Sequence, residues 1–250
     1  MRELKPKRAW PAAGAVLGTS LFLVAGSAAP APAEAVVPPA LSPGEQDASF
    51  PDPFLLYGGK ITFDVYRGGH KVGAHRVDFE REGMQLRMNA QMDLRISVLF
   101  FTAYRFSYRS QETWENGRLL AVSADVNDNG KEASVNAALE GGVFRIVGAR
   151  ETSEIESWTF PTNHWHHGQV GAATLLNTIT GRLARVETKS LGMDTVETAA
   201  GPMSAEQFEY TGDLRDTRVW YDANGRWIKM SFKAKDGSWI EYRCTSCGQA

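Results

Sequence analysis

The chain has 250 residues, of which 43% are hydrophobic and 22% are charged, and its formal net charge at pH 7 is −2. Charges of both signs are mixed along the sequence, which argues against nucleic acid or an anionic membrane surface as a partner. Residues 1–35 carry four of the 27 basic and two of the 29 acidic residues, so the chain without them has a net charge of −4. That remainder is one domain's worth of sequence and is long enough to bury a sizeable core.

The first 35 residues follow the order of parts found in a secretory signal peptide. Four cations, ending at Arg8, precede an uncharged run from Ala12 to Ala25, and small residues and prolines follow. This run of 14 residues is shorter than the roughly 20 that a membrane-spanning helix needs. We predict cleavage after Ala35 and export to the periplasm or the exterior, with no lipid attachment because no cysteine follows the run closely. An uncleaved membrane anchor is the alternative.

Proline marks the start of the folded part. Seven of the eleven prolines lie between Pro30 and Pro53, and only Pro161 and Pro202 come later. Proline-rich sequence with little apolar content favours an extended, solvated linker. We therefore predict a disordered linker over residues 36–53, a single domain over residues 54–243 and a short tail over residues 244–250.

Alternation of apolar and polar residues dominates the predicted domain. Every second residue from Leu86 to Val98 is apolar, which places one set of side chains on each face of a strand. Gly-Gly, Asn-Gly and Asp-Gly pairs separate this and further extended runs, and such pairs favour tight hairpins. The sequence predicts an all-β fold, a mainly antiparallel meander that forms a curved sheet, a half-barrel or a barrel.

One stretch after these strands lacks the alternation. Residues Val170 to Asn177 include good helix formers, and we predict a short helix or turn near residues 170–177 that crosses one end of the sheet. Such a segment would cap the core or act as a lid.

A histidine cluster precedes this stretch. In an extended chain His164 and His166 point to one side, as a metal pair requires, and His70, His75 or a carboxylate would supply a third ligand. The spacing is also common by chance. The alternative is a surface connection in which one histidine is hydrogen-bonded and the others are solvated.

The segment from Tyr104 to Trp114 alternates aromatic and polar residues. Tyr108 lies on the expected core face, whereas Arg109 lies on the other face. Glu112 falls on the aromatic side, and a carboxylate buried there needs a partner and often marks a site. The alternative places Glu112 in water at the end of a strand.

Near the C-terminus, Trp227 and Trp239 fall on the predicted polar face, where they would either line a contact surface or cover the sheet. Cys244 and Cys247 have the spacing of a redox motif, but only three residues follow Cys247, so no helix can begin there to stabilise a thiolate. In an oxidising compartment, a small disulfide is the expected state of this pair.

No motif for a bound nucleotide or an activated serine is present. The sequence contains neither a P-loop nor a dinucleotide fingerprint, and it has no Gly-x-Ser-x-Gly elbow. We therefore expect no cofactor and predict no catalytic residue.

The order and spacing of several residues resemble an uncharacterised family of bacterial exported proteins that carry a domain of unknown function. The resemblance covers residues 58–243, and it implies a secreted or periplasmic β-domain with no assigned activity. The family pattern includes His164 and Trp165 but not the two histidines that follow, which disfavours a metal role for His166. The fold is also similar to the half-barrel carriers of lipoproteins and lipids. The resemblance rests on Asp64–Arg67, Gly73, His75, Tyr104–Arg109, Glu112, Trp114, His164–Trp165, Leu176–Asn177, Thr180–Gly181, Tyr210–Asp213, Trp220–Asp222 and Gly225–Trp227.

The leading hypothesis for function is a periplasmic binding or carrier module for a lipophilic or envelope ligand. Its motive is the apolar run from Val98 to Ala103 beside the methionine-containing strand from Leu86 to Met92. The rivals are a metal-assisted or acid–base enzyme centred on His164 and a structural or assembly partner in the envelope. The candidate binding residues are Tyr108, Arg109, Glu112, His164, Trp165, Asn177, Trp220 and Asp222.

Overall fold

The structure is a computed structural model that describes residues 50–98 and 101–248. The predicted signal peptide and most of the predicted linker therefore lie outside the described residues, as do Leu99 and Phe100 of the apolar run that motivated the carrier hypothesis.

The described part consists of strands with one five-residue α-helix and two short 3₁₀ turns. In chain order the elements are α1 (Pro53–Tyr57), β1 (Lys60–Arg67), β2 (His70–Glu82), β3 (Gln85–Val98), β4 (Phe101–Glu115), β5 (Arg118–Asp128), β6 (Lys131–Glu140), β7 (Val143–Val147), β8 (Thr152–Ile155), η1 (His167–Gly171), β9 (Thr174–Leu176), β10 (Leu183–Arg185), β11 (Thr188–Thr198), β12 (Gly201–Tyr210), η2 (Gly212–Leu214), β13 (Thr217–Tyr221), β14 (Trp227–Lys233) and β15 (Trp239–Ser246).

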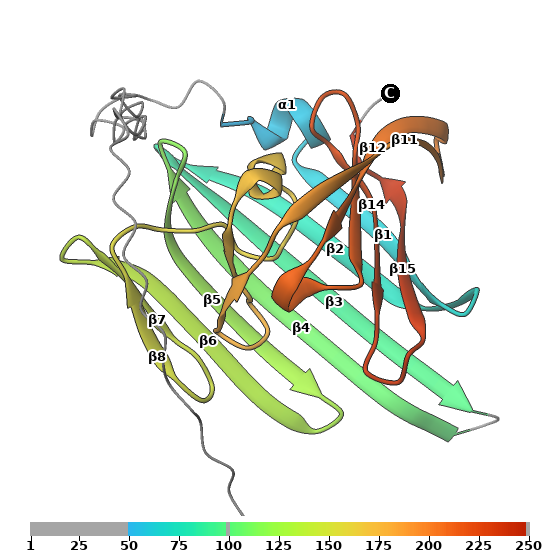
Figure 1. The fold of residues 1–250 in the computed structure, drawn as a ribbon, viewed down its shortest axis with the longest axis horizontal. Helices are drawn as coiled ribbons and strands as arrows, with labels where there is room; N and C mark the ends of the chain where they lie inside the picture. Colours follow the sequence, from blue (N-terminus) through green and yellow to red (C-terminus); the bar gives the residue numbers. More distant parts are fainter. Residues whose placement is uncertain (1–49, 99–100, 249–250) are drawn as a thin grey trace, which may run out of the picture. The chain divides into compact units, whose positions relative to one another are not determined.

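Thirteen strands form one antiparallel sheet in the order β11-β12-β13-β14-β15-β1-β2-β3-β4-β5-β6-β7-β8. Two meanders, β1–β8 and β11–β15, are joined where the first strand of the domain pairs with the last (Figure 1). The sheet is curved but not closed, because β8 and β11 each pair on one side only. The predicted all-β class, a curved antiparallel meander, is confirmed. The last strand continues to Ser246, so the fold includes Cys244, which the sequence reading placed in the tail.

The turn chemistry explains the hairpins of the first meander. Asn116 and Gly117 both have positive φ between β4 and β5, and Asn129 and Gly130 repeat this between β5 and β6. Two consecutive residues with positive φ give the turn whose twist matches that of antiparallel strands. Asparagine and glycine reach this region at low cost, which is why these pairs end the strands where the sequence predicts.

The alternation in β3 specifies which face is buried. Leu86, Met88, Ala90 and Met92 are buried, whereas Gln91 and the other intervening residues are half-buried or exposed. Because a strand alternates its side chains, a shift of one residue would expose this whole set, and the register is therefore strongly fixed. The buried set faces the concave side of the sheet.

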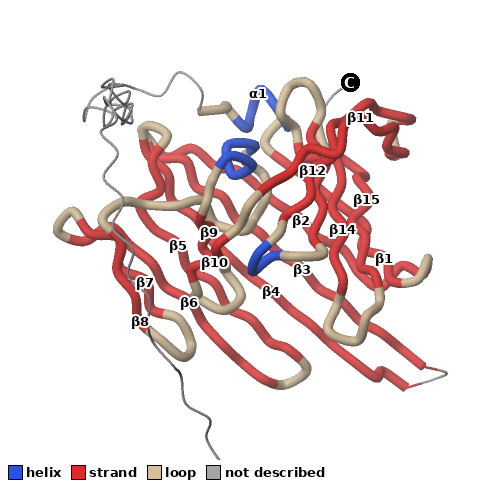
Figure 2. Tube along the Cα trace, viewed as in Figure 1, coloured by secondary structure: helices blue, strands red, loops and turns tan. Residues whose placement is uncertain are grey.

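The connection between β8 and β11 runs over this concave side. It contains η1 and the small two-stranded sheet of β9 and β10, which lie in front of the large sheet in Figure 2. The indole of Trp165 in this connection donates a hydrogen bond to Glu112 of β4, so the connection is attached to the sheet itself. This segment covers the concave face as a lid would.

The helix predicted over residues 170–177 is in the wrong place. The helical turn is η1, His167–Gly171, and Thr174–Leu176 forms β9. The backbone N–H of Leu176 donates to the carbonyl oxygen of Phe160, and Leu183–Arg185 pairs with β9. This stretch finds hydrogen-bond partners in neighbouring segments, and that tertiary pairing overrides its helix propensity.

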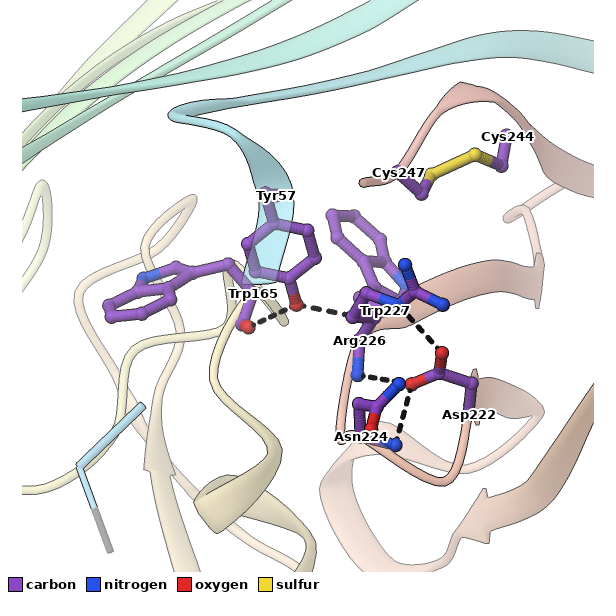
Figure 3. Close-up of polar contacts among 8 residues, drawn as sticks. All are labelled: Tyr57, Trp165, Asp222, Asn224, Arg226, Trp227, Cys244 and Cys247. Carbon is purple, nitrogen blue, oxygen red and sulfur yellow. Dashed lines mark hydrogen bonds and ion pairs between the residues drawn. A yellow bond between two sulfur atoms is a disulfide. The ribbon is translucent and has the colours of Figure 1, made fainter. Parts of the chain in front are cut away.

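The α-helix α1 instead lies at the start of the domain. Asp52 caps it by accepting a hydrogen bond from the N–H of Phe54, and Gly58 ends it in the left-handed conformation with a φ of 66°. The hydroxyl of Tyr57 donates to the carbonyl oxygen of Trp165 and accepts from the N–H of Trp227, at 2.8 and 2.9 Å (Figure 3). The helix thus ties the covering connection to β14.

Within residues 50–98 and 101–248, no helix is long and apolar enough to cross a membrane.

Candidate ligand-binding cavity

A cavity of about 580 Å³ lies between the concave face of the sheet and the connection that covers it. Its apolar wall comes from the inward-facing residues of four strands, and the register places them in layers. Met92, Leu94 and Ile96 of β3 lie opposite Tyr108, Phe106 and Tyr104 of β4. Met230 and Phe232 of β14 lie opposite Tyr242 and Ile240 of β15. All ten side chains line the cavity.

Burial increases along the cavity from the hairpin tips to the middle of the strands. Ile96 and Leu94 near the tip of β3 are half-buried, whereas Met92 is 6% exposed. At the tip of the β14–β15 hairpin, the side chain of Lys235 is 99% exposed. The cavity therefore has a mouth at the hairpin tips and an inner end under the covering connection.

The mouth carries charges of both signs. Arg67 forms an ion pair with Asp236, and the Nζ of Lys235 lies 3.7 Å from a carboxylate oxygen of Asp128. All four residues line the cavity. Because these pairs are exposed or partly exposed, they contribute little to stability and can rearrange around a ligand.

The inner end carries two buried histidines, His75 of β2 and His164 of the covering connection, which are 4% and 5% exposed. The ring of Trp227 packs against both, with centroid distances of 5.7 Å to each imidazole. Three of their ring nitrogens have no hydrogen-bond partner among the described residues: both nitrogens of His75 and the Nδ1 of His164. Burial lowers the pKa of His75 to about 3 and that of His164 to about 4, so both rings are neutral at pH 7.

His164 also has an unusual backbone. Its φ is 59°, in the left-handed region that few residues other than glycine, asparagine and aspartate adopt. The hydroxyl of Tyr221 donates to the carbonyl oxygen of His164 at 2.9 Å, which helps to hold this conformation. A non-glycine residue in this region is a local strain that the surrounding structure must maintain.

Beside the cavity, Glu112 is fully buried and forms the centre of a hydrogen-bonded chain. The indole N–H groups of Trp114 and Trp165 donate to one carboxylate oxygen at 2.8 and 2.9 Å, and the amide of Asn163 donates to the other. Asn163 in turn accepts from the hydroxyl of Tyr108 at 2.7 Å. The carboxyl group therefore couples β4 to the covering connection.

Two opposing effects set the pKa of Glu112. Burial disfavours the charged form and raises the pKa, while the three N–H donors favour the carboxylate and lower it. Burial is the larger effect, and the pKa is raised to about 7. Glu112 thus titrates near neutral pH although its hydrogen-bond partners suit the ionised form.

The structure brings five of the eight candidate binding residues to this region. Tyr108, His164 and Asn177 line the cavity. Glu112 and Trp165 lie behind its wall, joined to each other and, through Asn163, to Tyr108. The side chain of Asn177 also accepts hydrogen bonds from the N–H groups of residues 179 and 180, which stabilises the turn between β9 and β10.

The other three candidates do not line the cavity. Arg109 lies on the outer face and pairs with Asp93. The indole of Trp220 donates to Asp194 at 2.9 Å. The partner of Arg109 thus lies on the adjacent strand β3, and the partner of Trp220 lies on the edge strand β11.

Asp222, the third of them, organises the loop between β13 and β14. It accepts from the backbone N–H groups of Asn224 and Arg226 and pairs with the guanidinium of Arg226 at 2.7 Å (Figure 3). Both side chains of the pair are nearly buried, and its role in the described structure is to close the loop. Cys244 and Cys247 are joined in a disulfide, drawn in the same figure.

His164 and His166 do not form a metal pair. The Nδ1 of His166 accepts a hydrogen bond from the N–H of Gly168, and its ring packs against Trp114 and Phe160, away from the cavity wall. The left-handed backbone at His164 breaks the extended geometry that would have aligned the two rings. Over residues 50–98 and 101–248, no three His, Cys, Asp or Glu side chains are grouped as a metal site requires.

Nor do Trp227 and Trp239 share an exposed face. Trp227 is 1% exposed and lines the cavity, whereas Trp239 is 43% exposed with the guanidinium of Arg218 over its ring. The cause is a bulge in β14, where Trp220 and Tyr221 pair with Lys229 and Trp227. The extra residue reverses the alternation and turns Trp227 inward.

Sequence reasoning missed the wall formed by β14 and β15 and the role of Asn163. It considered His75 as a possible metal ligand and as part of the family pattern, but not as a residue that lines a cavity. The sequence does place His75 and His164 among apolar residues, and this was the available signal. Only the fold shows that β2 and the covering connection meet at Trp227.

Comparisons with known proteins agree with this architecture. Residues 63–245 match the family described as "Domain of unknown function (DUF6134)". No curated protein matches the chain. Among solved structures the chain is similar to a β-barrel-like protein of the domain of unknown function DUF1849 from Brucella abortus, with a TM-score of 0.52 and 12% identity, covering 75% of this chain and 95% of that chain. At that identity the likeness shows the fold alone.

Proposed function

The chain belongs to the family described as Domain of unknown function (DUF6134), and we propose that it is an exported binding or carrier module for a lipophilic ligand. The observation that carries the proposal is the cavity of about 580 Å³ in the concave face of the sheet. Binding sites for small molecules have this size range and combine an apolar wall with a few polar groups.

The composition of the wall supports an apolar ligand. Met92 and Met230 face the cavity from opposite sides of the sheet's curve, together with leucine, isoleucine and phenylalanine side chains. Methionine has flexible rotamers and a polarisable sulfur, so it adapts to ligands of different shape. A wall of this kind favours an acyl or other hydrocarbon chain over a polar metabolite.

Export remains an inference from residues 1–35, which have the sequence pattern of a signal peptide. A carrier for lipophilic molecules is useful in an aqueous compartment such as the periplasm, where such molecules are poorly soluble. Mass determination of the N-terminus of the protein recovered from the periplasm tests this part: a mature chain that begins at Val36 supports it, and an intact Met1 in the cytosolic fraction contradicts it.

Fluorescence titration with N-phenyl-1-naphthylamine tests the binding function. Wild-type protein should raise the emission of this apolar probe saturably. The double variant Leu94→Trp/Met230→Trp fills the cavity from two strands and should weaken probe binding at least about tenfold.

The matched control is Met84→Trp/Met193→Trp, which adds the same side chains at residues that are 69% and 65% exposed and lie outside the cavity wall. This control should bind the probe as the wild type does, and circular dichroism should show that both variants are folded. Absence of saturable binding by the wild type, or equal binding by the cavity variant and the control, would contradict the proposal.

A further inference from the structure

We propose that the inner end of the cavity, between His75 and His164, binds an uncharged hydroxyl group, and that the ligand is an apolar alcohol whose hydrocarbon chain points to the mouth. The inference rests on the proposed binding function and names the chemical class of its ligand. Its first support is that both imidazoles line the inner end of the cavity, and that both nitrogens of His75 and the Nδ1 of His164 lack hydrogen-bond partners among the described residues.

Unpartnered polar groups at such depth are costly. A buried donor or acceptor without a partner destabilises a protein by about 1–3 kcal/mol, and most buried polar groups are therefore hydrogen-bonded. Here three ring nitrogens of two neighbouring histidines lack partners at the inner end of the cavity. Glu112, close by, shows the usual arrangement, with three donors to its two oxygens.

The chemistry of neutral imidazole selects the ligand group. Each neutral ring offers one N–H donor and one lone pair. A hydroxyl both donates and accepts, so it can bond to the lone pair of one ring and the N–H of the other. An ether or ester oxygen only accepts, and it would satisfy only the N–H.

A carboxylate or phosphate suits the inner end poorly. Burial keeps both histidines uncharged, and no lysine or arginine lines the inner end. An anion placed there would be desolvated without a countercharge, which costs several kcal/mol. The cations of the cavity, Arg67 and Lys235, lie at the mouth and are paired with carboxylates.

Competition against bound N-phenyl-1-naphthylamine tests the proposal with three ligands of equal chain length: decan-1-ol, decyl methyl ether and decanoate at pH 7.5. In the wild type, decan-1-ol should displace the probe at about tenfold lower concentration than the ether, as expected for one additional hydrogen bond. Decanoate should be the weakest of the three.

Two variants locate the effect. His75→Phe keeps a ring of similar size but removes both nitrogens, and it should abolish the preference for the alcohol while leaving probe affinity within about twofold. The matched control is Tyr210→Phe, which removes another buried hydroxyl without a partner that does not line the cavity. Tyr210→Phe should keep the preference.

The outcomes separate this inference from the proposed function. If the wild type binds the probe but the alcohol and the ether compete equally, or if decanoate competes best, the inference is wrong and the binding function stands. If His75→Phe binds the probe and keeps the preference, the hydroxyl site is wrong. If the wild type binds no probe, both proposals fail.

Discussion

The carboxyl group of Glu112 and the two imidazoles of His75 and His164 are all buried, but they differ in their hydrogen-bond partners. Glu112 has three N–H donors around its carboxyl group, from Trp114, Trp165 and Asn163. His75 and His164, equally buried, have three nitrogens without partners. A buried polar group with all its partners holds the fold together, whereas one without partners in an apolar cavity marks a place where something binds. We therefore assign Glu112 to the architecture and the histidines to the ligand.

The largest expected loss of stability comes from removing the carboxyl group of Glu112, which has hydrogen-bond donors to both oxygens. Glu112→Leu would leave three buried donors without acceptors and should destabilise the protein by about 3–5 kcal/mol in urea denaturation. Glu115→Leu, on the other face of the same strand, should change the stability by no more than about 0.5 kcal/mol. Similar losses for the two variants would show that the Glu112 cluster does not hold the connection to the sheet.

The next prediction compares the loss of stability on removing two tyrosine hydroxyls, those of Tyr108 and Tyr210. The hydroxyl of Tyr108 contacts Asn163 and Thr178 at 2.7 Å each, whereas the hydroxyl of Tyr210 has no partner among the described residues. Tyr108→Phe should cost about 1–3 kcal/mol because Asn163 and Thr178 lose a buried partner. Tyr210→Phe should be neutral or stabilising. A loss above about 1 kcal/mol in Tyr210→Phe, measured in the same urea titration, would mean that its hydroxyl is partnered after all.

The third effect is a dependence of stability on pH. Since burial raises the pKa of Glu112 from 4.5 to about 7, the folded state holds this proton more tightly than the unfolded state. Its contribution to stability is full below pH 4.5 and is lost as the pH rises through 7. The stability of the wild type relative to Glu112→Gln should therefore fall between pH 5 and pH 8.

The comparison with Glu112→Gln isolates this group. His75 and His164 have lowered pKa values, so their contribution changes in the opposite direction, rising with pH up to about 6.5, but it is the same in both proteins. A difference in stability that stays constant or grows from pH 5 to pH 8 would contradict a raised pKa at Glu112.

Local patterns were sufficient to predict the strands. The alternation from Leu86 to Ile96 predicted the buried face of β3, and the Asn-Gly pairs at 116–117 and 129–130 predicted the β4–β5 and β5–β6 hairpins. For Glu112 the sequence allowed either the aromatic face of β4 or water at the end of a strand, and the structure buries it on the aromatic face. These features depend on neighbours in the sequence, and a pattern of period two reports them directly.

The features that the sequence did not predict depend on contacts between distant residues or on single irregularities of the backbone. One bulge turned Trp227 inward, and the left-handed residue His164 separated its ring from that of His166. The pairing of β1 with β15 brings β14 opposite β3, which creates the cavity, and no local pattern reports that pairing. Whether the interior is filled depends on the sum of side-chain volumes from both meanders.

A crystal structure with 8-bromooctan-1-ol tests the central claim most directly, because the anomalous signal of bromine marks the end of the chain opposite to the hydroxyl. The account predicts one ligand in the cavity, with bromine near Ile96 and Phe232 at the mouth and the oxygen within hydrogen-bond distance of His75 and His164. Bromine beside the two histidines, or a ligand bound only outside the cavity, would contradict it.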